Sequence, residues 1–365
     1  MRISKKEDVR MQWILKLEEL EQTEEEFVYF TDFEICSEVR IPGVFVYGDN
    51  MFLRCALFQE ADSNGLYTYI LRVRHSEKIF EYNEDDYSKD GYYFQEGLIG
   101  EIIALFSVYF QTRFYLKAQI IGKETQTSIR MRIEKGFQYR KVNSNLNSEM
   151  FTDQGRNWCK DNGLKFFLDS IRKLDQKYHQ NLIRSFHWYT EAIKEIGIDH
   201  QLFFIKMVSS VEALLNFFRI NEDRLEEKLS KLQKKHFFEK NEYVEIINWL
   251  ANRKIRRRFA DFFEKYSDNF FKNTEEVNSL YINKREVRKY VNQIYNARSA
   301  YLHEGKPMFL SMDLQGGGAI NWDFDPSLGM LVDRKKFSIK EKLPRVRWFE
   351  RITNHCLKNF IKNKL

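Results

Sequence analysis

The residues best suited to chemistry lie together in residues 295–305, which read Tyr-Asn-Ala-Arg-Ser-Ala-Tyr-Leu-His-Glu-Gly. Arg298 and His303 are separated by four residues in this segment. An arginine fork grips phosphate oxygens, and a histidine with an ordinary pKa of about 6.5 moves protons near neutral pH. RNA carries its own nucleophile, the 2′-hydroxyl, so these two groups suffice in principle to cleave it without a metal.

Both residues must be positioned by a helix, which the sequence predicts over residues 284–303. Apolar and aromatic residues recur there at steps of three and four, and Arg298 continues this inward stripe. His303 falls in the last turn, where the helix dipole favours imidazolium, and Gly305 suits the left-handed position that ends a helix. Five residues at about 100° each put Arg298 and His303 on different faces. They converge only if the last turn loosens or if two copies of the helix face each other.

Each member of the pair also has a structural interpretation. Arg298 is then a partly buried arginine paired with an acid, with Glu212 as the candidate, and His303 is a C-terminal helix cap. Glu212 is the one acid in the largely apolar run 207–218, and a buried acid needs a partner. Its two interpretations are a supporting role in orienting Arg298 and a salt bridge to another helix.

Two basic tracts are candidates for holding an RNA backbone. The first tract is Arg256, Arg257 and Arg258. The second tract is Lys342, Arg345, Arg347 and Arg351. Trp348 and Phe349 lie within the second tract and are available for base stacking. The alternative is a solvated helix face for the first tract and an amphipathic packing helix for the second.

The composition indicates a packed protein with an uneven charge. Of 365 residues, 43% are hydrophobic and 16% aromatic, and Pro and Gly are scarce, which argues against disorder and favours two domains. The net charge is +6, but residues 333–365 alone carry 11 Lys and Arg against 3 acids. A basic end suggests a phosphate-bearing partner such as RNA, and a solvated surface helix is the alternative.

Metal sites, disulfides and membrane spans have no clear signal in the sequence. The four cysteines, Cys36, Cys55, Cys159 and Cys356, are scattered without zinc-ligand spacing, so we expect reduced and mostly buried thiols. The remaining histidines are interpreted as structural or surface residues. We expect no metal and no cofactor. The N-terminus lacks a signal-peptide core and no apolar run reaches membrane-spanning length, which predicts a cytoplasmic protein.

The order of elements predicts an α+β domain over residues 1–150. Its expected helices cover residues 7–26 and 96–109. Its expected strands cover residues 27–30, 35–41, 44–47, 51–58, 66–75, 114–121 and 127–134, with a hairpin turn at 62–65. A polar linker is expected near residues 143–153.

An all-α helical bundle is predicted to follow over residues 151–365, ending in a basic helix. Its expected helices cover residues 165–177, 180–196, 200–218, 224–235, 241–266, 284–303 and 345–361. A small hairpin or flap is expected within residues 308–332, which contain three consecutive glycines.

The helical half resembles the HEPN superfamily, specifically the ApeA-like HEPN domains of bacterial defence proteins. Three stretches carry the resemblance: Phe-His-Trp-Tyr-Thr-Glu-Ala-Ile-Lys at 186–194, Leu-Phe-Phe-Ile-Lys-Met-Val-Ser-Ser-Val-Glu-Ala-Leu-Leu at 202–215, and Ile-Tyr-Asn-Ala-Arg-Ser-Ala-Tyr-Leu-His-Glu-Gly at 294–305. The family pattern usually has Gly directly after the histidine, whereas Glu304 intervenes here. An acid at this position is expected to repel RNA phosphate or to raise the pKa of the histidine.

The resemblance implies a helical bundle that forms a homodimer and brings two R-x4-H motifs into one composite site. Arg298 and His303 are then the catalytic pair, and Ser299 is a supporting residue. The implied function is a metal-independent endoribonuclease that leaves 2′,3′-cyclic phosphate ends and acts in phage defence by abortive infection. The N-terminal domain is then the place where a trigger molecule or phage protein is sensed. The alternative is a non-catalytic HEPN-type module that binds RNA or protein.

Overall fold

The chain forms two compact units. The computed structural model describes residues 10–24, 27–48, 51–76, 97–120, 162–196, 198–217, 231–232, 240–273, 282, 284–308, 312–313, 323–324, 331–332, 335–336, 343–344 and 346–364. The sheet unit comprises Met1–Ile198 and Ile361–Leu365, and the helical unit comprises Asp199–Phe360. The expected boundary near residue 150 lies outside the described residues.

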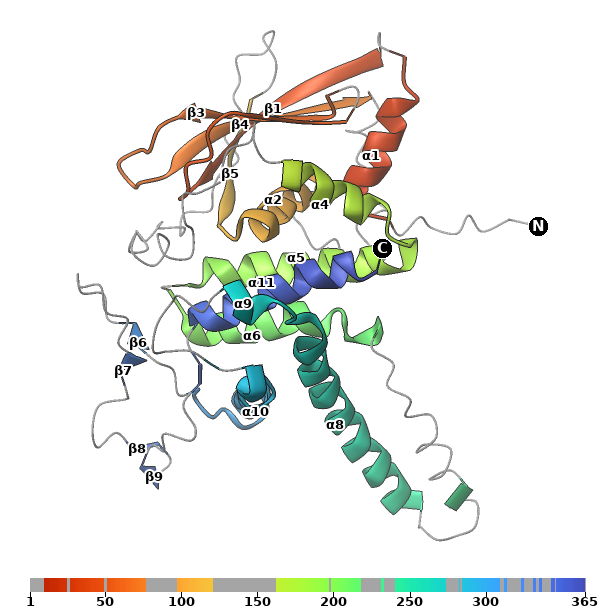
Figure 1. Cartoon of the computed structure of the whole chain (residues 1–365), viewed down its shortest axis with the longest axis vertical. Helices are drawn as coiled ribbons and strands as arrows, with labels where there is room; N and C mark the ends of the chain where they lie inside the picture. The colour runs from red at the N-terminus through yellow and green to blue at the C-terminus, as the bar shows by residue number, and fades with distance from the viewer. Residues whose placement is uncertain are drawn as a thin grey trace. The chain divides into compact units, whose positions relative to one another are not determined.

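The sheet unit is built on a five-stranded antiparallel sheet (Figure 1). Its strands are β1 (Val28–Ser37), β2 (Val44–Tyr47), β3 (Leu53–Gln59), β4 (Tyr67–Ser76) and β5 (Phe114–Ile120). The strand order is β2-β3-β4-β1-β5. The turn between β3 and β4 forms as expected, because Gly65 has φ +77° and donates its N–H to the Asp62 carbonyl at 2.9 Å.

The two expected strands 27–30 and 35–41 were wrong as separate elements, because β1 runs unbroken through Thr31 and Asp32. Alternation explains this continuity. Asp32 sits on the face opposite the core, where the Arg72 guanidinium of β4 holds it through two hydrogen bonds of 2.7 Å. A charged residue that is paired on the outer face therefore does not interrupt the strand.

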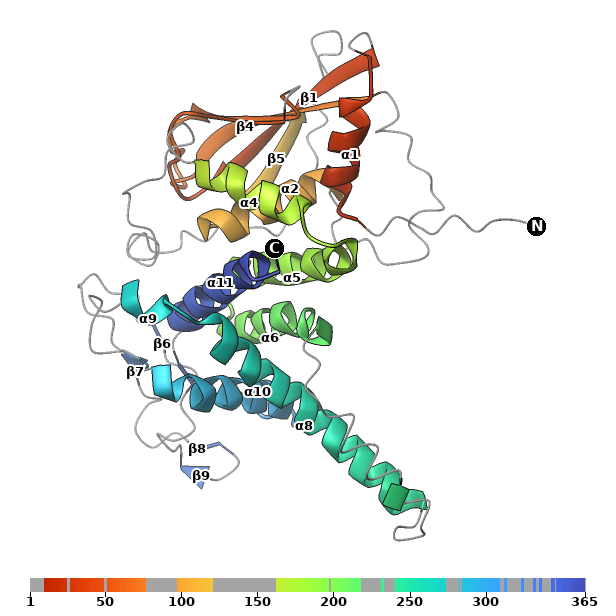
Figure 2. The ribbon, with the colours of Figure 1, turned by 45° about the vertical axis from the view of Figure 1, so that its right-hand side comes forward.

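Helices α1 (Gln12–Glu21), α2 (Gly97–Phe110) and α4 (Asn162–Arg172) lie on the inner face of this sheet. The helix α5 (His179–Lys194) packs on α2, one layer farther from the sheet. The α2 ring of Phe106 packs edge-on against Phe45 of β2 with centroids 6.3 Å apart. In Figures 1 and 2, α2 and α4 lie on the same side of the sheet.

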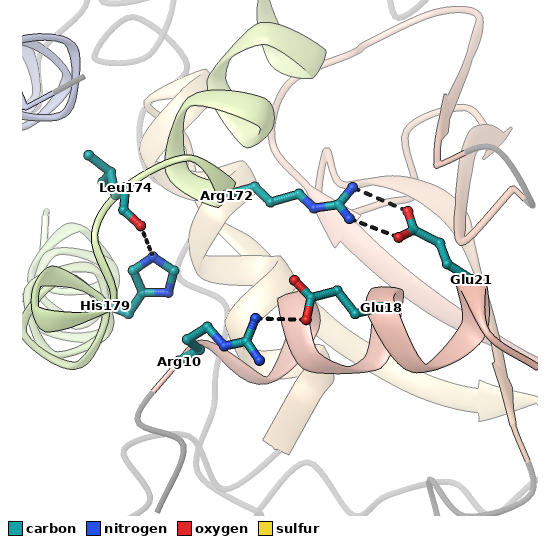
Figure 3. Close-up of polar contacts among 6 residues, drawn as sticks. All are labelled: Arg10, Glu18, Glu21, Arg172, Leu174 and His179. Carbon is teal, nitrogen blue, oxygen red and sulfur yellow. Dashed lines mark hydrogen bonds and ion pairs between the residues drawn. The ribbon is translucent and has the colours of Figure 1, made fainter.

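α4 and α5 pack with the sheet unit, although the sequence placed them in the helical domain. Tyr109 of α2 contacts Phe167 of α4 with ring centroids 5.5 Å apart, which explains this grouping. Arg172 pairs with Glu21 of α1 through two hydrogen bonds of 3.2 and 2.8 Å (Figure 3). His179 Nε2 lies 3.1 Å from the Leu174 carbonyl, so the ring closes the turn between α4 and α5 (Figure 3).

The helical unit surrounds an aromatic core. Its helices are α6 (His200–Glu212), α8 (Lys240–Tyr266), α9 (Phe270–Asn273), α10 (Val287–Glu304) and α11 (Val346–Lys362). Phe349 of α11 stacks on Phe204 of α6 with centroids 5.5 Å apart and contacts Phe263 of α8 at 5.9 Å. The last two residues of α11 belong to the sheet unit.

Two short strand pairs also belong to the helical unit. They are β6 (Met312–Asp313) with β7 (Asp323–Phe324), and β8 (Leu331–Val332) with β9 (Lys335–Lys336). The pairing of β6 with β7 agrees with the expected hairpin. The expected helix at 224–235 and strand at 127–134 lie outside the described residues, apart from a helical pair at 231–232.

Three expectations about side chains and the membrane are also addressed by the structure. Cys36, Cys55 and Cys356 are buried free thiols, as expected, whereas Cys159 lies outside the described residues. His75 and His179 are buried and hydrogen-bonded, which confirms their structural interpretation. Among the helices that the structure describes, none combines the length and the apolar character needed to cross a bilayer.

Candidate functional site

The site is organised by α10, which buries one face and leaves its C-terminal half accessible. Val287, Val291 and Ile294 recur at steps of four and three and are fully buried. After Ile294 the helix has no further fully buried residue, although it continues to Glu304. Gly305 ends it with φ 64°, so the expected left-handed terminator is confirmed.

Arg298 pairs with Glu212, the last residue of α6. Arg298 Nη2 donates to Glu212 Oε2 at 3.0 Å. The side chain of Arg298 is 18% exposed and that of Glu212 is 23% exposed. Tyr295, one turn earlier on α10, donates its hydroxyl to Glu212 Oε1, also at 3.0 Å. Both carboxylate oxygens of Glu212 are therefore used, and the guanidinium is fixed by a neighbouring helix. The expected Arg298–Glu212 contact is confirmed, whatever the function of Arg298.

The phenol of Tyr295 acts only as a donor in this cluster. Burial, followed by the neighbouring Glu212 carboxylate, raises the pKa of Tyr295 to about 12, while Arg298 and Arg256 lower it less. The phenol therefore keeps its proton throughout the neutral range. Phe259 of α8 packs on the same ring with centroids 5.2 Å apart, which holds this part of α10 against α8.

His303 differs from Arg298 in its surroundings, because it is exposed in the last turn of α10. Its ring makes no hydrogen bond within the described residues, and the helix is ended by the Gly305 backbone rather than by the imidazole. The Glu304 carboxylate beside it pairs with Lys306 Nζ at 2.5 Å. The unexpected acid at position 304 thus carries its own counter-charge, which weakens its repulsion of phosphate. Ser299 is half-buried next to Arg298.

A single copy of α10 does not bring Arg298 and His303 together. The helix keeps its regular hydrogen bonding up to Glu304, so the last turn does not loosen. Five residues of regular helix leave the two side chains about 140° apart around the axis. Of the two routes to convergence, only the pairing of two copies remains.

The first basic tract does not form one surface. Three consecutive helical residues span about 200° around the axis. Arg256 Nη1 donates to Asn296 Oδ1 of α10 at 3.1 Å, whereas Arg257 Nε lies 3.8 Å from Asp261 on its own helix. Arg258 is half-buried. Of the three, Arg256 is the one that contacts α10 and whose charge acts on Tyr295, so it is the strongest candidate for contact with a ligand there.

The second basic tract lies largely outside the described residues, and the prediction that Phe349 stacks on a base was wrong. Arg345 lies outside the described residues, and for Arg347 only the backbone is described. Phe349 is fully buried in the aromatic core, so it cannot stack on a base. Trp348 is half-buried and contacts Tyr290 of α10 with centroids 6.4 Å apart. The amphipathic packing interpretation therefore holds for this part of α11.

Sequence reasoning missed the contact of Tyr295 with Glu212 and the contact of Asn296 with Arg256. The signal for Tyr295 was its spacing, since it precedes Arg298 by three residues and shares its helical face. No comparable signal marked Asn296, because its partner Arg256 lies 40 residues away.

Within the described residues, no group of His, Cys, Asp or Glu is arranged to hold a metal ion. Comparisons with protein-family models, with curated proteins and with solved structures find no match for this chain.

Proposed function

We propose that the chain is a metal-independent endoribonuclease of the HEPN type, active as a homodimer and serving phage defence. The observation that best supports this is the contrast within α10. A carboxylate orients the guanidinium of Arg298, while the imidazole of His303 stands exposed one turn later. Leu302 beside it is 46% exposed and offers an apolar contact for a second copy.

In the proposed reaction, the 2′-oxygen of RNA attacks the adjacent phosphorus. His303 of one copy takes the 2′-hydroxyl proton, and His303 of the second copy gives a proton to the departing 5′-oxygen. The P–O5′ bond breaks as the P–O2′ bond forms, which leaves a 2′,3′-cyclic phosphate and a 5′-hydroxyl. Both Arg298 side chains bind the non-bridging oxygens, where negative charge increases in the transition state.

The defining experiment incubates the purified protein with total RNA, with and without EDTA, and maps the ends of the products. We expect cleavage that EDTA does not abolish, cyclic phosphate ends, and no cutting of an all-deoxy substrate of the same sequence. Efficient cleavage of the all-deoxy substrate would rule out the 2′-hydroxyl route.

Two α10 arginines provide a matched pair of variants for the same assay. Arg298→Ala is expected to abolish cleavage, and Arg288→Ala is expected to preserve it. Both changes remove an arginine that pairs with acids, since Arg288 contacts Asp261 at 2.8 Å and also contacts Glu264. Equal loss in the two variants would indicate that a helix contact, rather than the guanidinium of Arg298, matters for activity.

The second candidate function is a non-catalytic module that binds RNA or protein. It is favoured by the Arg298–Glu212 ion pair, because such a pair also serves to tie α10 to α6. Binding of RNA by the wild-type protein without any cleavage supports this module and rejects the nuclease.

A further inference from the structure

One exposed face of α10 leads from His303 to Asn296. Seven residues advance the helix by about 700°, so Asn296 lies within about 20° of His303 around the axis and about 10 Å from it along the axis. Both residues are exposed. Ser299 and Ala300 lie between them on this face and have small side chains. A strand that is bound at His303 can therefore follow the helix and reach Asn296.

Asn296 is held in one orientation by α8, which packs against α10 (Figure 2). Arg256 Nη1 of α8 donates to Asn296 Oδ1 at 3.1 Å. A guanidinium donates hydrogen bonds and accepts none, so the amide presents its oxygen to Arg256 rather than its nitrogen. Within the described residues, Asn296 Nδ2 has no hydrogen-bond partner, and the residue is exposed. The N–H groups of this amide are therefore accessible to a ligand.

Arg256 adds further donors beside this amide. Its hydrogen bond to Asn296 uses Nη1, whereas Nε and Nη2 form no hydrogen bond within the part of the chain that the structure describes. The one acceptor among the side-chain atoms of the two residues is Asn296 Oδ1, and a cation already engages it. Asn296 and Arg256, which we call the amide–guanidinium pair, therefore present mainly donors to a ligand.

A surface of donors favours a base whose edge carries only acceptors. On the edge that faces the major groove of a duplex, guanine presents two acceptors, O6 and N7, and no donor. Adenine presents N7 beside its amino donor, cytosine presents an amino donor, and uracil, like thymine, presents the single acceptor O4. An asparagine without a partner matches adenine, because its oxygen accepts from the amino group while its nitrogen donates to N7. Since Arg256 engages that oxygen, the pair in this chain matches guanine instead.

We propose that the amide–guanidinium pair recognises a guanine in the RNA that the chain cleaves. Asn296 Nδ2 and a second nitrogen of Arg256 donate to O6 and N7 of the base. This inference rests on the proposed ribonuclease function and adds a sequence preference to it. One strand of a duplex advances about 3.4 Å per nucleotide, so about 10 Å along α10 places the guanine within about three nucleotides of the scissile linkage. Neither residue contacts the reacting atoms in this arrangement, so both determine specificity rather than catalysis.

Binding to RNA that resists cleavage provides the first test. The full chain is titrated with short fluorescent oligouridines that carry one central guanine, adenine or cytosine, or none. 2′-O-methyl groups at every position block the nucleophile. We expect the guanine oligonucleotide to bind about tenfold more tightly than the adenine one, as measured by fluorescence anisotropy. Equal affinities for these two would overturn the inference, as would tightest binding of any other oligonucleotide or the absence of saturable binding.

Two asparagines on successive turns of α10 provide matched variants. Asn296→Ala is expected to reduce the affinity ratio of guanine over adenine to about one, while the affinity for plain oligouridine is kept. Asn292→Ala is the control, because Asn292 Nδ2 donates to the Arg288 carbonyl at 2.8 Å and is engaged within its own helix. The affinity for oligouridine checks that each variant folds. A ratio that stays at the wild-type value in Asn296→Ala would refute the assignment.

Arg256→Met separates base recognition from a merely structural contact. The substitution removes the donor from Asn296 Oδ1 and so restores the acceptor that adenine requires. The preference is expected to move from guanine to adenine, a change that loss of helix packing alone does not produce. A guanine preference that persists in this variant would contradict the role of the pair.

End mapping distinguishes failure of this inference from failure of the proposed function. In the products of total RNA, we expect guanine to be enriched at one position within about three nucleotides of the cut. This enrichment is expected for the wild type and for Asn292→Ala, but not for Asn296→Ala. Cleavage without enriched guanine would overturn this inference and leave the ribonuclease intact. Guanine-selective binding by a protein that cuts no RNA would reject the ribonuclease and leave the recognition of guanine in place.

Discussion

Arg298 of α10 and Glu212 of α6 are joined by a hydrogen-bonded ion pair with 3.0 Å between Nη2 and Oε2. The pair is partly buried, and the second carboxylate oxygen is bound by Tyr295. Within the described residues, Arg298 Nε has no hydrogen-bond partner. Within those residues the guanidinium is therefore held by one nitrogen, Nη2, and its Nε is buried without a partner.

Glu212→Gln is expected to lower the rate of RNA cleavage by about 10- to 100-fold, while RNA affinity changes little. The amide keeps its shape but loses the charge that fixes Arg298. Single-turnover cleavage and filter binding measure the two effects. Glu264→Gln is the control, because that residue pairs with Arg288 at the other end of α10. A variant that lost affinity but kept its maximal rate would show that Glu212 does not position the arginine.

Tyr295→Phe is expected to lower the free energy of unfolding by about 1 kcal/mol, because one oxygen of the partly buried Glu212 loses its donor. The phenyl ring still packs on Phe259, so the loss reports the hydrogen bond and not the packing. Urea unfolding at neutral pH measures the change. An unfolding free energy equal to that of the wild type would mean that water replaces the hydroxyl without cost.

Gly305→Ala is expected to destabilise the protein by about 1 kcal/mol and to reduce cleavage by loosening the turn that carries His303. A Cβ at this position meets no atom within 4 Å, so the cost comes from φ 64° alone. Gly65→Ala is a matched control with φ +77° and equally open space in the sheet unit. The two variants should lose similar stability, but only the first should lose activity. Equal activity of the Gly305→Ala and Gly65→Ala variants would show that cleavage does not depend on the turn that carries His303.

Glu101 makes the stability of the sheet unit depend on pH. Burial raises the pKa of Glu101 from 4.5 to about 7, against the smaller opposing effect of hydrogen bonds from the Trp13 and Gln12 backbone. The folded state therefore keeps a proton that the unfolded chain has already released. Stability contributed by this group falls as pH rises from about 4.5 to about 7, by up to about 1.4 kcal/mol per pH unit.

Glu101→Gln is expected to remove that slope, because the amide oxygen still accepts from the Trp13 N–H, 3.1 Å away in the wild type, but does not ionise. Urea midpoints measured at several pH values between about 5 and about 7 give the slope for each protein. The difference between wild type and variant is the relevant quantity, since it cancels the other titrating groups. Parallel slopes would show that Glu101 ionises normally in the folded protein.

Mixed dimers test whether the two imidazoles act together. Adding His303→Ala chains to a fixed amount of wild-type chains is expected to reduce cleavage by about half at equal amounts, because random pairing places half of the wild-type chains in mixed dimers. Added Arg288→Ala chains should cause no such loss. Cleavage that stays constant as His303→Ala chains are added would assign the reaction to a single copy.

Much of the fold follows from local pattern. Alternation located β2 at Val44–Tyr47, and three-and-four periodicity located α10 to within three residues. β1 was predicted as two strands in error, because a charged residue such as Asp32 disfavours a strand locally. The partner of Asp32, Arg72, is 40 residues away in the sequence, so a local pattern does not include it. The grouping of α4 and α5 with the sheet also depends on distant contacts, such as Phe167 with Tyr109.

The site was predictable in part for the same reason. The pairing of Arg298 with Glu212 was one of two alternatives, because a charge on an apolar helical stretch needs a partner and Glu212 is the one acid in the run 207–218. The role of Phe349 was wrong because aromatic residues beside cations occur both in stacking surfaces and in cores. The contacts of Phe349 with Phe204 and Phe263 decide between them.

The unbroken last turn of α10 has a consequence for control of the proposed enzyme. In the proposed site a lone chain supplies one arginine and one histidine, and the regular helix holds them on different faces of α10. Mass action then governs activity: when most chains are unpaired, doubling their number quadruples the population of competent pairs. A cell making the proposed enzyme at low abundance would be spared damage to its own transcripts until synthesis or recruitment brings copies together.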